Sequence, residues 1–117
     1  MYLDNKLYTY KAVVTKIVDG DTVDLNIDLG LEIWSKNTRI RLLDLNTPEL
    51  RGSEREAGLR AKEFLEKVIP IGSDIYITTH KDKRGKYGRL LGTLYTNKGV
   101  SINTRLLEEG YAEYIKY

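Results

Sequence analysis

Cysteine is absent from this sequence, and histidine occurs only once, at His80. Without cysteine there can be no disulfide framework and no thiolate chemistry, and with a single histidine a zinc site is disfavoured as well. No apolar run approaches the roughly 20 residues that a membrane-spanning helix needs, and residues 1–6 lack the apolar core of a signal peptide. We therefore expect no membrane contact and, by default, a cytoplasmic location.

Overall charge is low, but its distribution along the chain is uneven. The 117 residues carry a net charge of +2, with 41% hydrophobic and 31% charged residues, which is typical of a soluble globular protein with a modest core. We expect one domain over residues 1–117 and a monomer. Between His80 and Arg89 there are five Lys or Arg residues and one acid. Such a local positive potential can attract phosphate although the net charge is small.

The pattern of apolar residues predicts five strands and two helices. The strands are expected at Tyr8–Val18, Thr22–Leu29, Thr38–Leu45, Asp74–Thr79 and Leu90–Tyr95. A capping box at Ser53–Glu56 predicts the start of the first helix, which Pro70 and Gly72 would end. Ser101 is expected to cap the second helix and Gly110 to end it.

Strands that follow one another as hairpins do not suit a parallel α/β sheet. The fold class we predict is therefore mainly β with helices (α+β): a small five-stranded barrel of the oligonucleotide-binding type, with two helices.

Two polar segments become informative when they are considered together. The first is the turn Asp19-Gly20-Asp21-Thr22, and the second runs from Arg41 through Asn46-Thr47-Pro48-Glu49. Taken singly, each fits ordinary turn or strand-end chemistry, and Arg41 fits either a structural ion pair or a phosphate contact. If the sheet joins them, carboxylate and amide oxygens surround one point, which suits Ca²⁺ or Mg²⁺ better than zinc. The combination predicts phosphodiester chemistry.

The basic segment Lys86-Tyr87-Gly88-Arg89 precedes the fifth predicted strand. One interpretation is a solvated charged turn, the usual fate of a charge run. The other places Arg89 on a phosphate, with Lys86 and Tyr87 along a nucleotide.

Three blocks in this order resemble the staphylococcal nuclease (thermonuclease) family. They are Val18–Thr22, Arg41–Glu49 and Lys86–Arg89, and the similarity extends from about Val13 to about Ala112. The resemblance implies an oligonucleotide-binding barrel and Ca²⁺-dependent hydrolysis of DNA and RNA.

By position, the resemblance also implies a role for each site residue. Asp21 would bind the metal, together with Asn46 and the backbone carbonyl of Thr47, and Glu49 would act as the general base. Arg41 and Arg89 would bind the phosphate, while Lys86 and Tyr87 would contact the nucleotide.

The chain departs from the family at Asn46, where relatives have an aspartate, so the metal site has one negative charge fewer. Asp44 lies two residues earlier, and strand alternation would place it on the same face as Asn46. We therefore expect Asp44 to return part of the missing charge.

Two functions from different classes fit these residues. The first is a metal-dependent nuclease that acts on DNA, RNA or both with little sequence specificity. The alternative is a catalytically weak or inactive nucleic-acid-binding module of the same fold. The presence of Arg41, Glu49 and Arg89 favours the enzyme.

Overall fold

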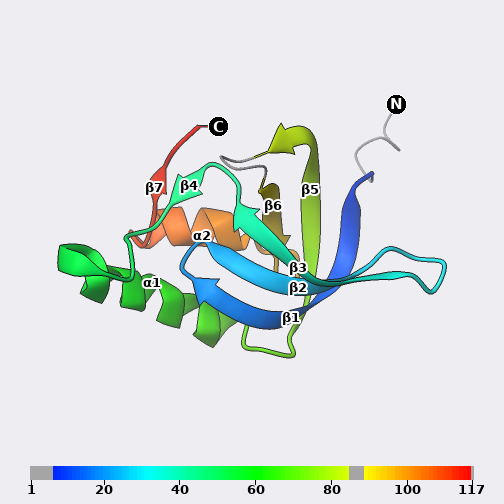
Figure 1. Cartoon of the computed structure of the whole chain (residues 1–117), viewed down its shortest axis with the longest axis horizontal. Helices are drawn as coiled ribbons and strands as arrows, with labels where there is room; N and C mark the ends of the chain where they lie inside the picture. The colour runs from blue at the N-terminus through cyan, green and yellow to red at the C-terminus, as the bar shows by residue number, and fades with distance from the viewer. Residues whose placement is uncertain (1–6, 85–88, 117) are drawn as a thin grey trace.

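Five strands close into a barrel in the computed structural model, which describes residues 7–84 and 89–116. The barrel strands are β1 (Thr9–Asp19), β2 (Thr22–Asp28), β3 (Trp34–Leu42), β5 (Asp74–Arg84) and β6 (Leu90–Tyr95), joined in the order β1-β2-β3-β6-β5. Neighbours are antiparallel except β3 and β6, which pair in parallel. This architecture, shown in Figure 1, confirms the predicted α+β barrel.

Two helices flank the barrel on the side where β1 turns into β2 (Figure 1). They are α1 (Arg55–Val68), preceded by a short 3-10 turn η2 (Gly52–Glu54), and α2 (Ile102–Glu108). Neither of these helices has the length and apolar character needed to cross a membrane, and the same is true throughout the described part of the chain.

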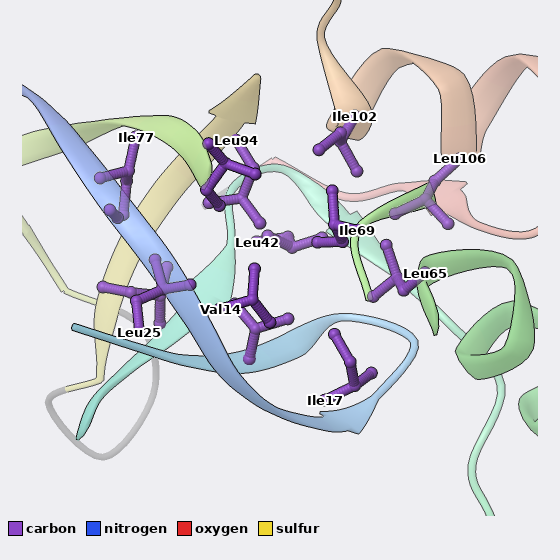
Figure 2. Close-up of a cluster of buried hydrophobic side chains, with 14 of the residues drawn as sticks. Val14, Ile17, Leu25, Leu42, Leu65, Ile69, Ile77, Leu94, Ile102 and Leu106 are labelled. Carbon is purple, nitrogen blue, oxygen red and sulfur yellow. The ribbon is translucent and has the colours of Figure 1, made fainter. Parts of the chain in front are cut away.

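The core lies inside the barrel and continues under the helices. On β2, Val23, Leu25 and Ile27 are buried, as the alternation in the sequence predicts, because successive side chains of a strand point to opposite faces. Figure 2 shows a cluster in which side chains from the barrel strands lie together with side chains from the helices and the helix ends. The contacting residues include Val14, Leu25, Leu42, Ile77 and Leu94 from the strands, with Leu65, Ile69, Ile102 and Leu106 from the helical side.

The third predicted strand is divided in two. It begins earlier than expected, at Trp34, ends at Leu42, and resumes as β4 (Leu45–Asn46). Asp44 adopts a left-handed backbone with φ of 61°, which lies outside the backbone conformation of a regular strand. The polypeptide therefore turns at Asp44, and Asn46 belongs to a different strand from Arg41.

The first helix does not begin with the predicted capping box. It starts at Arg55, and its N-cap residue Glu54 makes no side-chain cap hydrogen bond. The Glu54 carboxylate instead accepts a hydrogen bond from the backbone N–H of Glu49, at 3.0 Å. The prediction for the second helix is confirmed, since Ser101 Oγ accepts from the Thr104 N–H at 3.2 Å.

Two contacts fasten the C-terminal part of the chain beside β4. The strand β7 (Glu113–Tyr114) pairs with β4, so that Glu113 lies opposite Asn46. On α2, the buried side-chain amide of Asn103 donates to the carbonyls of Leu43 and Gly92 and accepts from the Leu94 N–H. Asn103 thus joins α2 to the segment between β3 and β4, and no feature that we used in the sequence predicted this role.

Candidate active site

The turn between β1 and β2 lies tightly against α1 because its central residue is glycine. A Cβ atom on Gly20 would lie 2.6 Å from Ala61 Cβ and 2.9 Å from Thr47 Oγ1. These separations are shorter than non-bonded carbon and oxygen atoms tolerate, so only glycine fits here. The close approach brings the acidic turn next to the segment that carries Thr47.

Asp21 is the centre of the polar network in this region. Its Oδ2 atom lies 3.1 Å from Arg41 Nη1 and accepts a hydrogen bond from the Thr47 N–H at 3.1 Å. Its Oδ1 atom accepts from Thr22 Oγ1 at 3.0 Å. The side chain is almost fully buried, at 9% exposed. Asp21 therefore connects β2, β3 and the segment after β4 through one carboxylate.

Arg41 extends this network toward β4. Its side chain is 6% exposed, and besides Asp21 it donates from Nη1 to the Leu45 carbonyl at 3.1 Å and from Nη2 to Asn46 Oδ1 at 3.0 Å. The ion-pair interpretation of Arg41 is thus correct for its contacts within the protein. Those contacts also orient its planar guanidinium, the group that binds phosphate through two parallel hydrogen bonds.

A pocket of about 250 Å³ opens over this network. It is lined by residues from the turn between β1 and β2, from β3, from β4 and the segment after it, and from the position just before β6. These residues are Asp19, Asp21, Thr22, Arg41, Asn46, Thr47, Pro48, Glu49 and Arg89. The structure therefore brings together six of the residues predicted for the site, while Lys86 and Tyr87 lie outside the described residues. The catalytic and binding roles of all eight residues stay predictions.

Glu49 lies at the open rim of the pocket. Its side chain is 66% exposed, and its Oε2 atom is 3.7 Å from Arg51 Nε. An exposed ion pair of this length contributes little energy. The carboxylate is therefore accessible to a water molecule, as a general base must be.

Asp19 lines the pocket although the sequence-based prediction did not include it in the site. Its Oδ1 atom accepts a hydrogen bond from the Asp21 N–H at 3.1 Å. Burial raises the pKa of Asp19 to about 6, and the hydrogen bond to Asp21 and the negative charge of Asp21 act in the same direction. The signal was present in the sequence, because two acids that flank one glycine in a tight turn must lie close together.

The pKa of Asp21 changes in the opposite direction. Burial favours the neutral acid, but the hydrogen bond with Asp19, the charge of Arg41 and the bonds from Thr47 and Thr22 together lower the pKa below its usual value. Below about pH 6, Asp19 therefore carries a proton, while the neighbouring Asp21 stays ionised.

The expectation that strand alternation places Asp44 on the same face as Asn46 is wrong. Asp44 lies in the left-handed turn between β3 and β4, so strand alternation does not relate it to Asn46, and it does not line the pocket. Glu113 is the acid that the tertiary structure places across from Asn46.

The oxygen atoms that line the pocket are of the chemical types that bind hard cations. They include the carboxylates of Asp19, Asp21 and Glu49, the Asn46 amide oxygen and the oxygens of Thr47, and Ca²⁺ and Mg²⁺ prefer such donors. Asn46 Oδ1 already accepts one bond from Arg41, but an amide oxygen has a second lone pair. Among the described residues, no group of three or more His, Cys, Asp or Glu side chains is arranged to hold a metal. The donors are thus of a kind that hard cations prefer, but they carry fewer negative charges than an all-carboxylate site.

The barrel with its flanking helices and this pocket define a nuclease-like domain of the oligonucleotide-binding type. The sequence profile described as "Staphylococcal nuclease homologue" matches residues 39–117, which is more than half of the chain. The chain belongs to the staphylococcal nuclease family.

Relatives from bacteria and archaea resemble most of this chain. Endonuclease YhcR of Bacillus subtilis is 30% identical over 112 residues, covering 88% of this chain and 9% of that protein. An uncharacterized protein of Methanocaldococcus jannaschii is 32% identical, covering 88% of this chain and 58% of its own length. An uncharacterized endonuclease of Escherichia coli O157:H7 is 26% identical, covering 85% and 57%. The chain therefore matches only part of each of these relatives.

Proposed function

We propose that this domain is a nuclease that hydrolyses phosphodiester bonds of DNA, RNA or both with the help of a divalent cation, most readily Ca²⁺. The observation that carries the proposal is the shared pocket of Arg41, Glu49, Arg89 and the Asp19–Asp21 pair. Family membership and two relatives named as endonucleases support the same activity.

In the proposed reaction, Glu49 accepts a proton from a water molecule that attacks the phosphorus atom. As the new P–O bond forms, the bond from phosphorus to the leaving sugar oxygen breaks, and this oxygen takes up a proton from the solvent. The position of Glu49 at the rim allows both water and a polyanion to reach it. Arg41 and Arg89 donate hydrogen bonds to the phosphate oxygens, and these bonds strengthen as charge develops in the transition state. Asp21, Asn46 and the Thr47 carbonyl would hold the cation, with Asp19 beside them. A bound cation would polarise a phosphate oxygen.

The proposal also covers substrate range. The lining residues are suited to phosphate and cation rather than to base edges, and phosphate contacts carry no sequence information by themselves. We therefore propose cleavage with little sequence specificity.

One observation favours the alternative, a binding module without turnover. Asn46 contributes no charge, and its amide oxygen is hydrogen-bonded to Arg41, so cation binding is weaker than with an aspartate at this position. A module of this kind would still present Arg41 and Arg89 to a nucleic-acid backbone.

The deciding experiment is degradation of plasmid DNA and of RNA with Ca²⁺, Mg²⁺, Mn²⁺ or excess chelator, with Glu49→Gln as the control for contaminating nuclease. The enzyme proposal expects cleavage with at least one cation, none with chelator, and a rate lowered by about 10²–10⁴-fold in Glu49→Gln. Full activity in chelator would contradict the cation requirement. Binding of an oligonucleotide without cleavage under any cation would establish the binding module instead.

A further inference from the structure

The backbone that presents Glu49 rests directly on α1 at Gly58. A Cβ atom built on Gly58 would lie 2.8 Å from the Pro48 carbonyl oxygen and 2.8 Å from the Glu49 carbonyl carbon. Both neighbours are backbone atoms, which cannot move aside as the end of a flexible side chain can. Any side chain at this position would therefore displace the Pro48–Glu49 segment or the helix.

The same segment is held by the residues where α1 begins. The Glu49 N–H donates to Glu54 Oε1 at 3.0 Å, and Arg55 Nη1 donates to the Leu50 carbonyl at 3.3 Å. These two hydrogen bonds hold residues 48–50 against the helix, and the absence of a side chain at Gly58 allows this close approach. Together they determine where the Glu49 carboxylate stands relative to the pocket.

A second close contact lies almost one turn farther along α1. Ala61 is fully buried and is the residue against which the Gly20 turn packs. Residues three positions apart share one face of a helix, so a single face of α1 contacts both halves of the site. All residues of α1 are described, and none of them lines the pocket.

We propose that Gly58 is a positioning residue for the hydrolysis, acting through the backbone of Glu49. The face of α1 formed by Gly58 and Ala61 sets the separation between the acidic turn and the proposed base. This inference rests on the proposed function, because it assigns Glu49 a role in turnover.

The Gly58→Ala variant tests the inference with the smallest added group. Alanine is a better helix former than glycine, so the helix itself should persist, while the added methyl group displaces Glu49. Because misplacement by about 1 Å can lower a rate by about 100-fold, we expect kcat to fall about 10- to 100-fold. KM and the cation affinity measured by calorimetry should stay within about twofold of the wild-type values. The atoms nearest to the added methyl group belong to Pro48 and Glu49, not to the proposed metal ligands Asp21, Asn46 and Thr47.

Gly92→Ala is the matched control. The three atoms nearest to a Cβ atom there are side-chain atoms of Ile40 and Ile77, at 3.0 to 3.3 Å, so it tests the same added methyl group in the barrel core. Its kcat should stay near wild type. Adding Gly58→Ala to Glu49→Gln should cause no further loss, because the displaced base is already inactive. Equal loss of kcat in both glycine variants, or a full additional loss in the Glu49→Gln background, would overturn the inference.

A measurement that needs no activity separates this inference from the proposed nuclease function. Hydrogen exchange at the Glu49 amide, which is bonded to Glu54, should be faster in Gly58→Ala than in wild type or Gly92→Ala. Unchanged exchange would refute the positioning role even if the protein cleaves nothing. If Gly58→Ala fails to fold, the surface variant Glu54→Ala replaces it, with the same expected fall in kcat and the same faster exchange, and wild-type values for both would refute the role.

Discussion

Replacing Arg41 by lysine measures the energy of the buried network that forms the floor of the pocket. Arg41 donates to three acceptors, on Asp21, Leu45 and Asn46. A lysine ammonium can keep the Asp21 contact, but it has no planar fork with which to reach the other two. Hydrogen bonds involving a charged group contribute about 1.5–3 kcal/mol each, so two lost bonds amount to about 3–6 kcal/mol. We expect a value near 3 kcal/mol, since water entering from the pocket can replace part of the loss.

The variant should remain folded, because a domain of this length has a stability of about 6–18 kcal/mol at 0.05–0.15 kcal/mol per residue. A loss of about 3 kcal/mol corresponds to a Tm lower by about 12 °C. Urea unfolding followed by circular dichroism measures the free energy directly.

Arg39→Lys is the matched control on the same strand. Arg39 makes a two-bond ion pair with Asp24, at 2.8 and 3.1 Å, but its side chain is 52% exposed. Exposed ion pairs contribute less than about 1 kcal/mol, so this change should have a small effect. Losses of equal size at the two positions would refute the claim that burial makes the Arg41 network strong.

The same substitution separates an enzyme from a binding module when it is made at Arg41 and at Arg89. In an enzyme, each change should reduce the cleavage rate far more than the affinity for a cleavage-resistant oligonucleotide, because both contacts strengthen in the transition state. Parallel losses of rate and affinity would argue against transition-state stabilisation by these arginines.

Three further predictions concern the carboxylates and the amide. Asn46→Asp should tighten cation binding in a calorimetric titration by restoring a negative charge, and equal or weaker affinity would show that Asn46 is not a ligand. Glu49→Gln should lower the cleavage rate by about 10²–10⁴-fold, as loss of a general base does, and an unchanged rate would remove Glu49 from the mechanism. The pKa of Asp19 is raised to about 6, so the folded protein holds this proton more tightly than the unfolded chain. The resulting stabilisation is complete below about pH 4 and is lost as pH rises through 6. The urea midpoint of the wild-type protein should therefore fall between pH 4 and 7, and Asp19→Asn should abolish this fall. An identical fall in the variant would assign the effect to other groups.

The sequence by itself determined the barrel and most of the pocket. Alternation along β2 and the Ser101 cap are local signals, because they depend on side-chain period and backbone chemistry within a few residues. The order of the motifs then predicted that Asp21, Arg41, Asn46, Thr47, Glu49 and Arg89 come together, and they all line one pocket.

Only the tertiary structure decided how those residues are connected. Asp44 takes a left-handed conformation and breaks the predicted strand, so strand alternation does not place its carboxylate on the face of Asn46. The capping box predicted at Ser53–Glu56 does not form, and Glu54, at the N-cap of α1, holds the Glu49 amide instead. The pairing of β4 with β7 and the contact of Gly58 with Glu49 join segments separated in the chain. Such approaches depend on how elements pack, and no local pattern of residue types encodes their distances.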